Sequence, residues 1–217
     1  MLRAEKYYAW ILRSAPDDRD WACRPSGINA RPTRLDMIKR IYFRPEYTPS
    51  MVAELESPYS RDVFWQSKKL SLDPLNFSCK CTAQKIYQQD IINSTAGSFL
   101  VSERTRAIVD AFVPSNTLQF LPAILKCHDN KLIYLYLVNT LHQEKIVDIE
   151  ASEKLKVGPS DDDFILLDRG LIFVPGALKE KKIGRNLPNP HNTEIFLHDD
   201  LVQLLIENKI DKNIIFD

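Results

Sequence analysis

Hydrophobic and polar positions follow regular periods most clearly after residue 98. Ser102 is a good N-cap, and Glu103 suits the first turn of a helix, where the helix dipole favours negative charge. Because proline cannot continue a helix, Pro114 should end it. The apolar positions between them recur at helical spacing and predict one buried stripe, which consists of Ala107, Ile108, Ala111 and Phe112.

Two strand-like apolar runs come next, over residues 118–126 and 131–141. The segment between them contains Asp129-Asn130, a pair with turn chemistry, so the two runs predict a β-hairpin. Residues 131–138 are apolar on both faces of the second strand. This pattern is typical of a central strand that is covered on both sides.

Weaker patterns follow the hairpin. Residues 145–150 predict a further strand, and residues 164–167 form an apolar segment after a polar loop. Residues 175–193 contain several prolines and glycines and predict a long loop.

The last residues predict a second helix and a packed tail. Asp199 or Asp200 should cap this helix, and its inner face consists of Leu201, Leu204 and Leu205. Residues 214–216 are large and apolar, so the tail should pair or pack rather than stay exposed.

The first part of the chain is less regular. Residues 5–13 are aromatic and apolar enough for a strand, and residues 14–34 have loop composition. Residues 35–97 combine dense prolines with many aromatics. Proline breaks helices and central strands, while aromatics argue against disorder. We therefore expect short helices and irregular structure that pack on a core.

These elements predict an α+β fold, with a mixed, mostly antiparallel sheet, a central hairpin and flanking helices. The chain divides into a variable N-terminal region, residues 1–97, and a more regular α+β region, residues 98–217. We expect the two regions to pack as one globular unit, which a chain of 217 residues can support.

Charge and composition exclude some classes of function. Lys plus Arg and Asp plus Glu each number 29, so a global basic field for nucleic acid is absent. No apolar run approaches the ~20 residues of a membrane-spanning helix. The N-terminus lacks the features of a secretory signal, so we expect a cytoplasmic protein with no membrane partner.

The four cysteines do not form a disulfide framework. Cys79-x-Cys81 could suggest zinc, but structural zinc sites use wider spacings in pairs. We therefore expect free thiols, and neither a metal nor another cofactor. Glu207-x-Lys209 matches half of a nuclease motif, but it lies at the predicted end of a helix, where a lysine complements the dipole.

Two groups of carboxylates are candidate site residues. Asp148 and Glu150 lie two apart on a predicted strand, so both would point the same way and could form an acid/base or metal-binding pair. A solvated edge, or capping of backbone donors by Asp148, Glu150 and Ser152, is the simpler interpretation. The run Asp161, Asp162 and Asp163 is either a solvated loop or a docking edge for basic groups of a partner.

Residues 98–217 resemble, in matching order, the immunity protein 11 family of bacterial immunity proteins. The resemblance rests on six segments: residues 100–104 (LVSER), 118–122 (LQFLP), 136–141 (YLVNTL), 146–152 (IVDIEAS), 172–173 (IF) and the final helix with its tail near Phe216. One departure is Asn213, because the family tends to have a glycine shortly before the terminal phenylalanine. Asn also tolerates a positive φ.

The resemblance implies a protein that binds and neutralises a cognate secreted polymorphic toxin of a type VI or contact-dependent system. Binding would be stoichiometric and non-enzymatic, and the family offers no catalytic residues to carry over. Asp148, Glu150 and the run 161–163 are then candidate toxin-binding residues. Two alternatives stay open: a metal-dependent hydrolase or nuclease that uses Asp148 and Glu150, and a non-catalytic adaptor. The sequence leaves the oligomeric state open.

Overall fold

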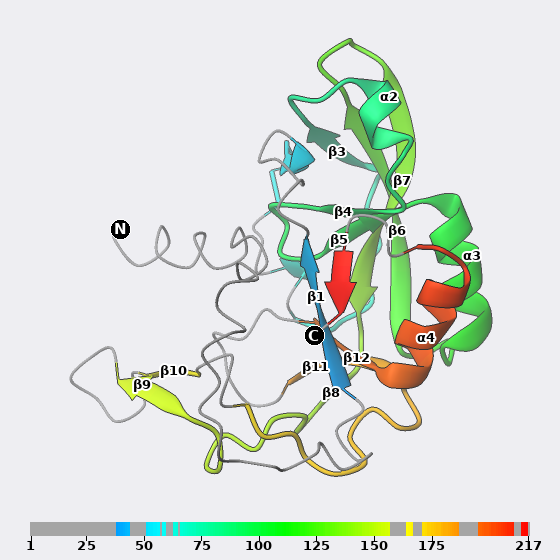
Figure 1. The fold of residues 1–217 in the computed structure, drawn as a ribbon. Helices are drawn as coiled ribbons and strands as arrows, with labels where there is room; N and C mark the ends of the chain where they lie inside the picture. The colour runs from blue at the N-terminus through cyan, green and yellow to red at the C-terminus, as the bar shows by residue number, and fades with distance from the viewer. Residues whose placement is uncertain are drawn as a thin grey trace, which may run out of the picture.

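The computed structural model has an α+β fold with mostly antiparallel sheets, which confirms the predicted class (Figure 1). It describes residues 38–43, 51–56, 58–59, 63–64, 66–156, 164–166, 171–186, 195–210 and 214–216. The predicted strand over residues 5–13 and the loop over 14–34 lie outside these residues.

A six-stranded sheet forms the larger part of the fold, in the order β2-β3-β6-β7-β5-β4. The predicted hairpin is confirmed and lies at its centre: β6 and β7 pair over nine positions, from Leu118 opposite Thr140 to Lys126 opposite Leu132. Asn130 closes the turn with a φ of 58°, which asparagine tolerates. The strand bounds are β2 Glu54–Leu55, β3 Leu75–Ser78, β4 Ile91–Asn93, β5 Phe99–Val101, β6 Leu118–Lys126 and β7 Leu132–Thr140.

This sheet curls until its two edges meet. Ala53 and Ser94 form a parallel bridge, in which Ala53 N donates to Asn93 O at 2.9 Å and Thr95 N donates to Ala53 O at 2.9 Å. The curl encloses a core of aliphatic, aromatic and cysteine side chains. Helix α2, Ala83–Ile86, adds two buried side chains to that core.

A second sheet has the order β13-β1-β12-β11-β8. The C-terminal strand β13 pairs with β1, and Ile214 is buried, so the predicted packing of the tail is confirmed. A separate ladder joins β9 to β10. The bounds are β1 Ile38–Phe43, β8 Gln143–Glu144, β9 Lys154–Lys156, β10 Phe164–Leu166, β11 Ile183–Asn186, β12 Ile195–His198 and β13 Ile214–Phe216.

Two helices, α3 (Glu103–Phe112) and α4 (Asp199–Glu207), pack on each other and on the sheets. Both were predicted, and Ser102 caps α3 by accepting a hydrogen bond from Thr105 N. Their apolar faces meet the outer sides of β5 and β7 in a second core. No helix in the described part of the chain is long and apolar enough to cross a membrane.

The predicted buried stripe of α3 is wrong. Thr105, Val109 and Val113 are buried, while Ala107, Ala111 and Phe112 are exposed and Ile108 is half-buried. Thr105 can lie inside because its hydroxyl donates to Asp90 O at 3.3 Å. Alanine gives a weak periodic signal, since it is tolerated on either face.

The N-cap of α4 also differs from the prediction. His198, not Asp199 or Asp200, is the cap residue, and its Nδ1 accepts from Asp200 N at 3.2 Å. The two aspartates occupy the first turn. The predicted inner face holds, with Leu201 and Leu205 buried and Leu204 half-buried.

Three other segments differ from the prediction. The described residues of 35–97 contain the short helix α2 and strands β1 to β4, with irregular residues between them, where short helices and irregular structure alone were expected. The predicted loop over 175–193 contains β11. Residues 145–150 are not a strand: Val147 makes one bridge to Phe173, and a turn follows.

Candidate functional site

The two central strands use their two faces differently. Side chains alternate between faces along a strand. One set points into the curled sheet and is buried along the whole hairpin; it consists of Leu121, Ala123, Leu125, Ile133, Leu135 and Leu137. The other set points outward, and its surroundings change along the hairpin.

The outer face is covered only where the helices reach it. Phe120, Tyr136 and Val138 pack in the second core with α3 and α4. Beyond that point the hairpin extends past both helices, toward the β6–β7 turn at the top of Figure 1. The expectation that residues 131–138 are covered on both sides is therefore wrong for the half nearest the turn.

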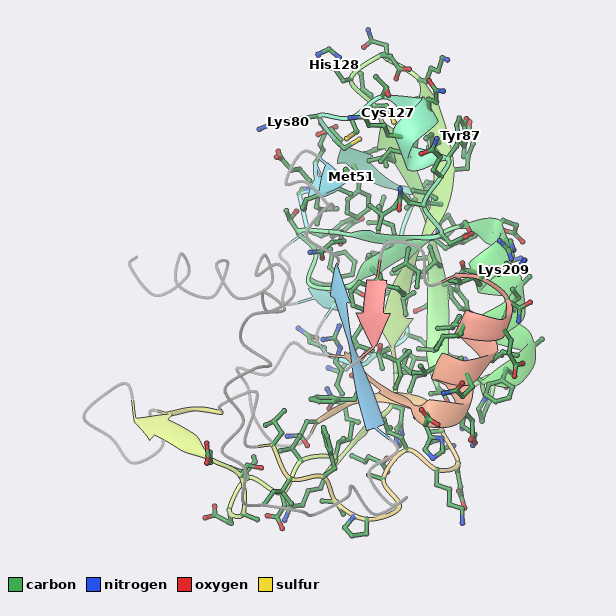
Figure 2. The ribbon with its side chains drawn as sticks, in the orientation of Figure 1. Met51, Lys80, Tyr87, Cys127, His128 and Lys209 are labelled. Carbon is green, nitrogen blue, oxygen red and sulfur yellow. The ribbon has the colours of Figure 1, made fainter. Side chains whose placement is uncertain are left out.

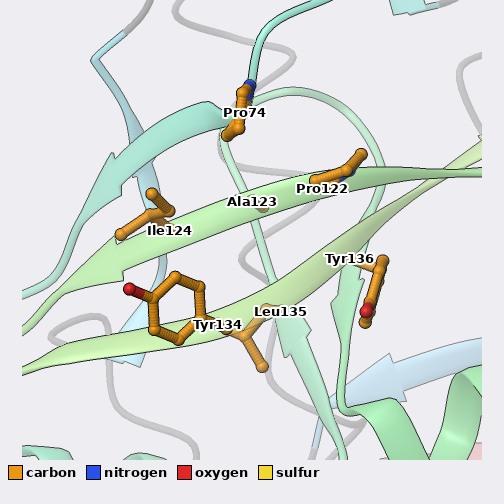
Figure 3. Close-up of a pocket in the computed structure, with 7 residues that line it drawn as sticks. All are labelled: Pro74, Pro122, Ala123, Ile124, Tyr134, Leu135 and Tyr136. Atoms are coloured by element: carbon orange, nitrogen blue, oxygen red, sulfur yellow. The ribbon is translucent and has the colours of Figure 1, made fainter.

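The uncovered part is apolar and partly hollow. Tyr134 is 74% exposed and Leu132 is 52% exposed. A hollow of about 140 Å³ lies beside Tyr134, with Pro74 and Pro122 among its lining residues. Figure 3 shows the ring of Tyr134 beside Ile124 on the neighbouring strand. We call Pro74, Pro122, Ile124, Leu132 and Tyr134 the open hairpin face.

Charged groups border this face at the start of α3. Arg106 forms an ion pair with Glu103 at 2.7 Å and stacks over the Tyr136 ring, 4.6 Å from its centroid. The hydrogen bond from Arg106, followed by that from Tyr136, lowers the pKa of Glu103. The hydrogen bond to Glu103 raises the pKa of Tyr136. An apolar centre with a charged, hydrogen-bonded border is the usual anatomy of a protein-binding surface.

Asp148 has a local structural role. Its carbonyl oxygen accepts from Ser152 N at 2.9 Å and from Ser152 Oγ at 2.7 Å. Ser152 Oγ in turn accepts from Ile172 N at 2.9 Å. The Asp148 carboxylate accepts from Ala151 N at 3.4 Å and lies 3.8 Å from Lys145 Nζ. These contacts confirm the capping interpretation of Asp148 and Ser152.

Glu150 is exposed in the same turn as Asp148. Because this segment is a turn, the prediction that a strand aims both carboxylates in one direction is wrong. Within the described ranges, no group of three His, Cys, Asp or Glu side chains could hold a metal ion. Asp161, Asp162 and Asp163 lie outside the described residues.

The chain matches no protein-family model, and no curated protein matches it. The resemblance of residues 98–217 to immunity proteins therefore stays a prediction.

Proposed function

We propose that this protein is a non-catalytic bacterial immunity protein. It acts in the cytoplasm of the producing cell and neutralises a cognate secreted toxin, of a type VI or contact-dependent system, by stoichiometric binding. The observation that carries the proposal is the open hairpin face, an apolar surface that no described element of the chain covers. The ordered sequence resemblance over residues 98–217 supports the immunity class.

The open hairpin face has the properties of a binding centre. Tyr134 and Leu132 stand on β7, which pairs with β6 along its whole length, so the backbone that carries them loses little freedom when a partner docks. Tyrosine is enriched among residues that dominate binding energy, because it combines large apolar area with a polar tip. Burial of this face against a partner would release about 25 cal/mol per Å² of apolar surface removed from water.

The occupant we propose is the toxin itself. The hollow of about 140 Å³ has room for one aliphatic or aromatic side chain, which the toxin would insert beside Tyr134. The Arg106–Glu103 pair at the border offers both a cation and a carboxylate for polar contacts. Asp161, Asp162 and Asp163 remain candidates for a second, electrostatic contact with a basic toxin surface.

The turn that holds Asp148 and Glu150 gives the hydrolase or nuclease alternative no support. Strands β8 and β9, which flank that turn in sequence, lie toward the end of the molecule away from the β6–β7 turn (Figure 1). In the proposal, Asp148 keeps its capping role, and Asp148→Ala leaves protection intact.

The test is survival of cells that express the toxin encoded beside this protein. Cells with the wild-type protein should survive, and purified toxin and protein should form a one-to-one complex. The Leu132→Ser/Tyr134→Ser double variant should lose both properties while keeping its circular dichroism spectrum. Ile172→Ser is the matched control, because Ile172 is 49% exposed, close to the 52% of Leu132, and lies outside the open hairpin face.

Two outcomes would contradict parts of the proposal. Killing that is equally efficient with and without the wild-type protein would exclude an immunity function. Full protection by the folded double variant would keep immunity but exclude the open hairpin face as the binding surface.

A further inference from the structure

Three buried cysteines, Cys79, Cys81 and Cys127, gather at the end of the curled sheet nearest the β6–β7 turn. Cys79 directly follows β3, and Cys127 directly follows β6. Figure 2 marks Cys127 at this end of the molecule, next to His128. The core alone does not require two thiols in contact here, since other small apolar side chains would fill the same space.

The sheet register brings two of these thiols together. Strands β3 and β6 are parallel, with Ser78 opposite Lys126, so the next position pairs Cys79 with Cys127. The backbone keeps this alignment, because Cys79 N donates to Lys126 O at 3.0 Å. The Sγ atoms of Cys79 and Cys127 are 3.9 Å apart.

This geometry suits a disulfide. Neighbouring strands lie about 4.8 Å apart, which is inside the range of about 4.4–6.8 Å that disulfides require between Cα atoms. The sulfurs must therefore approach mainly by rotation of the side chains, without a change in strand pairing. Cys81 is less suited, because it follows Cys79 by two residues on a backbone that leaves the strand.

We propose that Cys79 and Cys127 form a reversible disulfide when the protein meets hydrogen peroxide. The Cys79 thiolate attacks one peroxide oxygen, the O–O bond breaks, and water and a Cys79 sulfenic acid result. Cys127 sulfur then attacks the sulfenic sulfur, the new S–S bond forms, and a second water leaves. In total two thiols lose two hydrogen atoms and one peroxide is reduced to two waters. A small dithiol reverses the reaction by exchange.

The order of the two steps follows from the environments of the thiols. Cys79 is 8% exposed and Cys127 only 2%, so a small oxidant reaches Cys79 first. Burial raises the pKa of both thiols, and that of Cys127 rises to about 12. At Cys79, hydrogen bonds with the Cys81 carbonyl and then with Cys127 oppose this rise in pKa, whereas the hydrogen bond with Cys79 adds to the rise at Cys127. Cys79 is therefore the easier thiol to ionise, and Cys127 is the resolving cysteine.

The bond would tie the end of β3 to the base of the β6–β7 turn. Cys127 is the neighbour of Lys126, which pairs with Leu132 of the open hairpin face. Oxidation therefore fixes the end of the hairpin that carries this face. The inference does not depend on toxin binding, so its test and that of the proposed function fail independently.

The test uses the full chain, reduced, desalted and then treated with hydrogen peroxide under native conditions. Peptide mapping without reduction should find most molecules with a Cys79–Cys127 link, and a dithiol should remove it. The rate should rise about tenfold per pH unit near neutrality, because only the thiolate reacts. Cys81→Ser should keep the link, and Cys127→Ser should stop at a Cys79 sulfenic acid that dimedone traps.

Any of three results would overturn the inference. They are a link that uses Cys81 or Cys23, oxidation of Cys79 to sulfinic acid in the wild type without a link, and thiols that stay reduced in folded protein. Because the wild type and Cys81→Ser report the link directly, the conclusion does not depend on whether Cys127→Ser folds.

Discussion

Tyr134 on β7 lies directly opposite Ile124 on β6, and the two side chains share the outer face of the hairpin. Neighbouring positions on the same strands, such as Leu135, point into the curled sheet and are buried. Tyr134 is exposed because the helix that covers the outer face is shorter than the strand. Helix α3 has ten residues, about 15 Å, whereas β7 has nine residues, about 30 Å. A helix this short covers only half of the strand.

The first prediction tests this division of faces. Tyr134→Ala should change the free energy of unfolding by less than about 1 kcal/mol, because only an exposed cross-strand pair is lost. Leu135→Ala on the same strand should cost about 2–5 kcal/mol, because it leaves a cavity in the core. Urea unfolding of the two variants gives both values. A similar large loss for both would mean that the outer face is covered in solution.

Local signals in the sequence were sufficient to predict part of the fold. Ser102 marks the start of α3, and Asp129-Asn130 marks the hairpin turn, because caps and turns depend on a few adjacent residues. Strand β11 was missed because its residues, IGRN, carry little strand signal. It forms by pairing with β12, the next strand along the chain, and with β8, which is distant in sequence.

The candidate site was predicted less well than the fold. The apolar run 131–138 was recognised, but its two faces were both assigned to the core. Comparing the predicted helix length with the strand length could have revealed the uncovered half. The carboxylates Asp148 and Glu150 were predicted to lie on a strand. In the structure a side chain, not a neighbouring strand, accepts the backbone hydrogen bonds of residues 146 and 147, and the hydrophobic pattern around these residues cannot reveal such a partner.

That side chain is Asn186, and the second prediction concerns it. Asn186 Oδ1 accepts from both Ile146 N and Val147 N at 2.8 Å, in a buried site. Asn186→Ala leaves both donors unpaired, and each costs about 1–3 kcal/mol, so we expect a loss of about 2–6 kcal/mol in the free energy of unfolding. The amides of Ile146 and Val147 should also lose protection from hydrogen exchange.

Asn186→Asp is the matched control for this variant. It keeps an oxygen in the same position, so both backbone amides retain an acceptor and their exchange stays slower than in Asn186→Ala. An Asn186→Ala protein with wild-type stability and exchange would show that another group satisfies these amides.

The third prediction uses an unusual feature of the α3 cap. Ser102 Oγ accepts from Thr105 N at 3.2 Å and donates to Asp90 Oδ1 at 2.8 Å. Ser102→Ala should cost about 1–2 kcal/mol, the usual range for loss of a cap. Ser102→Thr should restore stability. Ser102→Asp, normally a good cap, should not, because its carboxylate would face that of Asp90. Equal stability of the Ser and Asp proteins in urea would exclude a role for Asp90.

The fourth prediction concerns the cap of α4, where His198 Nδ1 accepts from Asp200 N at 3.2 Å. Only the neutral imidazole offers this acceptor. His198 is 6% exposed, and burial lowers its pKa below the ordinary 6.5, against the attraction of Asp200, which raises it. Lys182 also lies near, since its Nζ forms an ion pair with Asp200.

A lowered pKa in the folded state means that the unfolded chain binds the proton more readily. The stability that His198 contributes is therefore fully present above pH 6.5, the ordinary histidine value, and is lost as the pH falls below it. Urea unfolding from about pH 7.5 to about pH 5.5 should show this loss in the wild type. His198→Asn keeps a capping oxygen that does not titrate, so its stability should fall less over the same interval. Equal slopes for the two proteins would mean that His198 remains neutral in both states or gains a partner when protonated. If stability fell more steeply with pH in the variant than in the wild type, the pKa of His198 in the folded protein would be raised, not lowered.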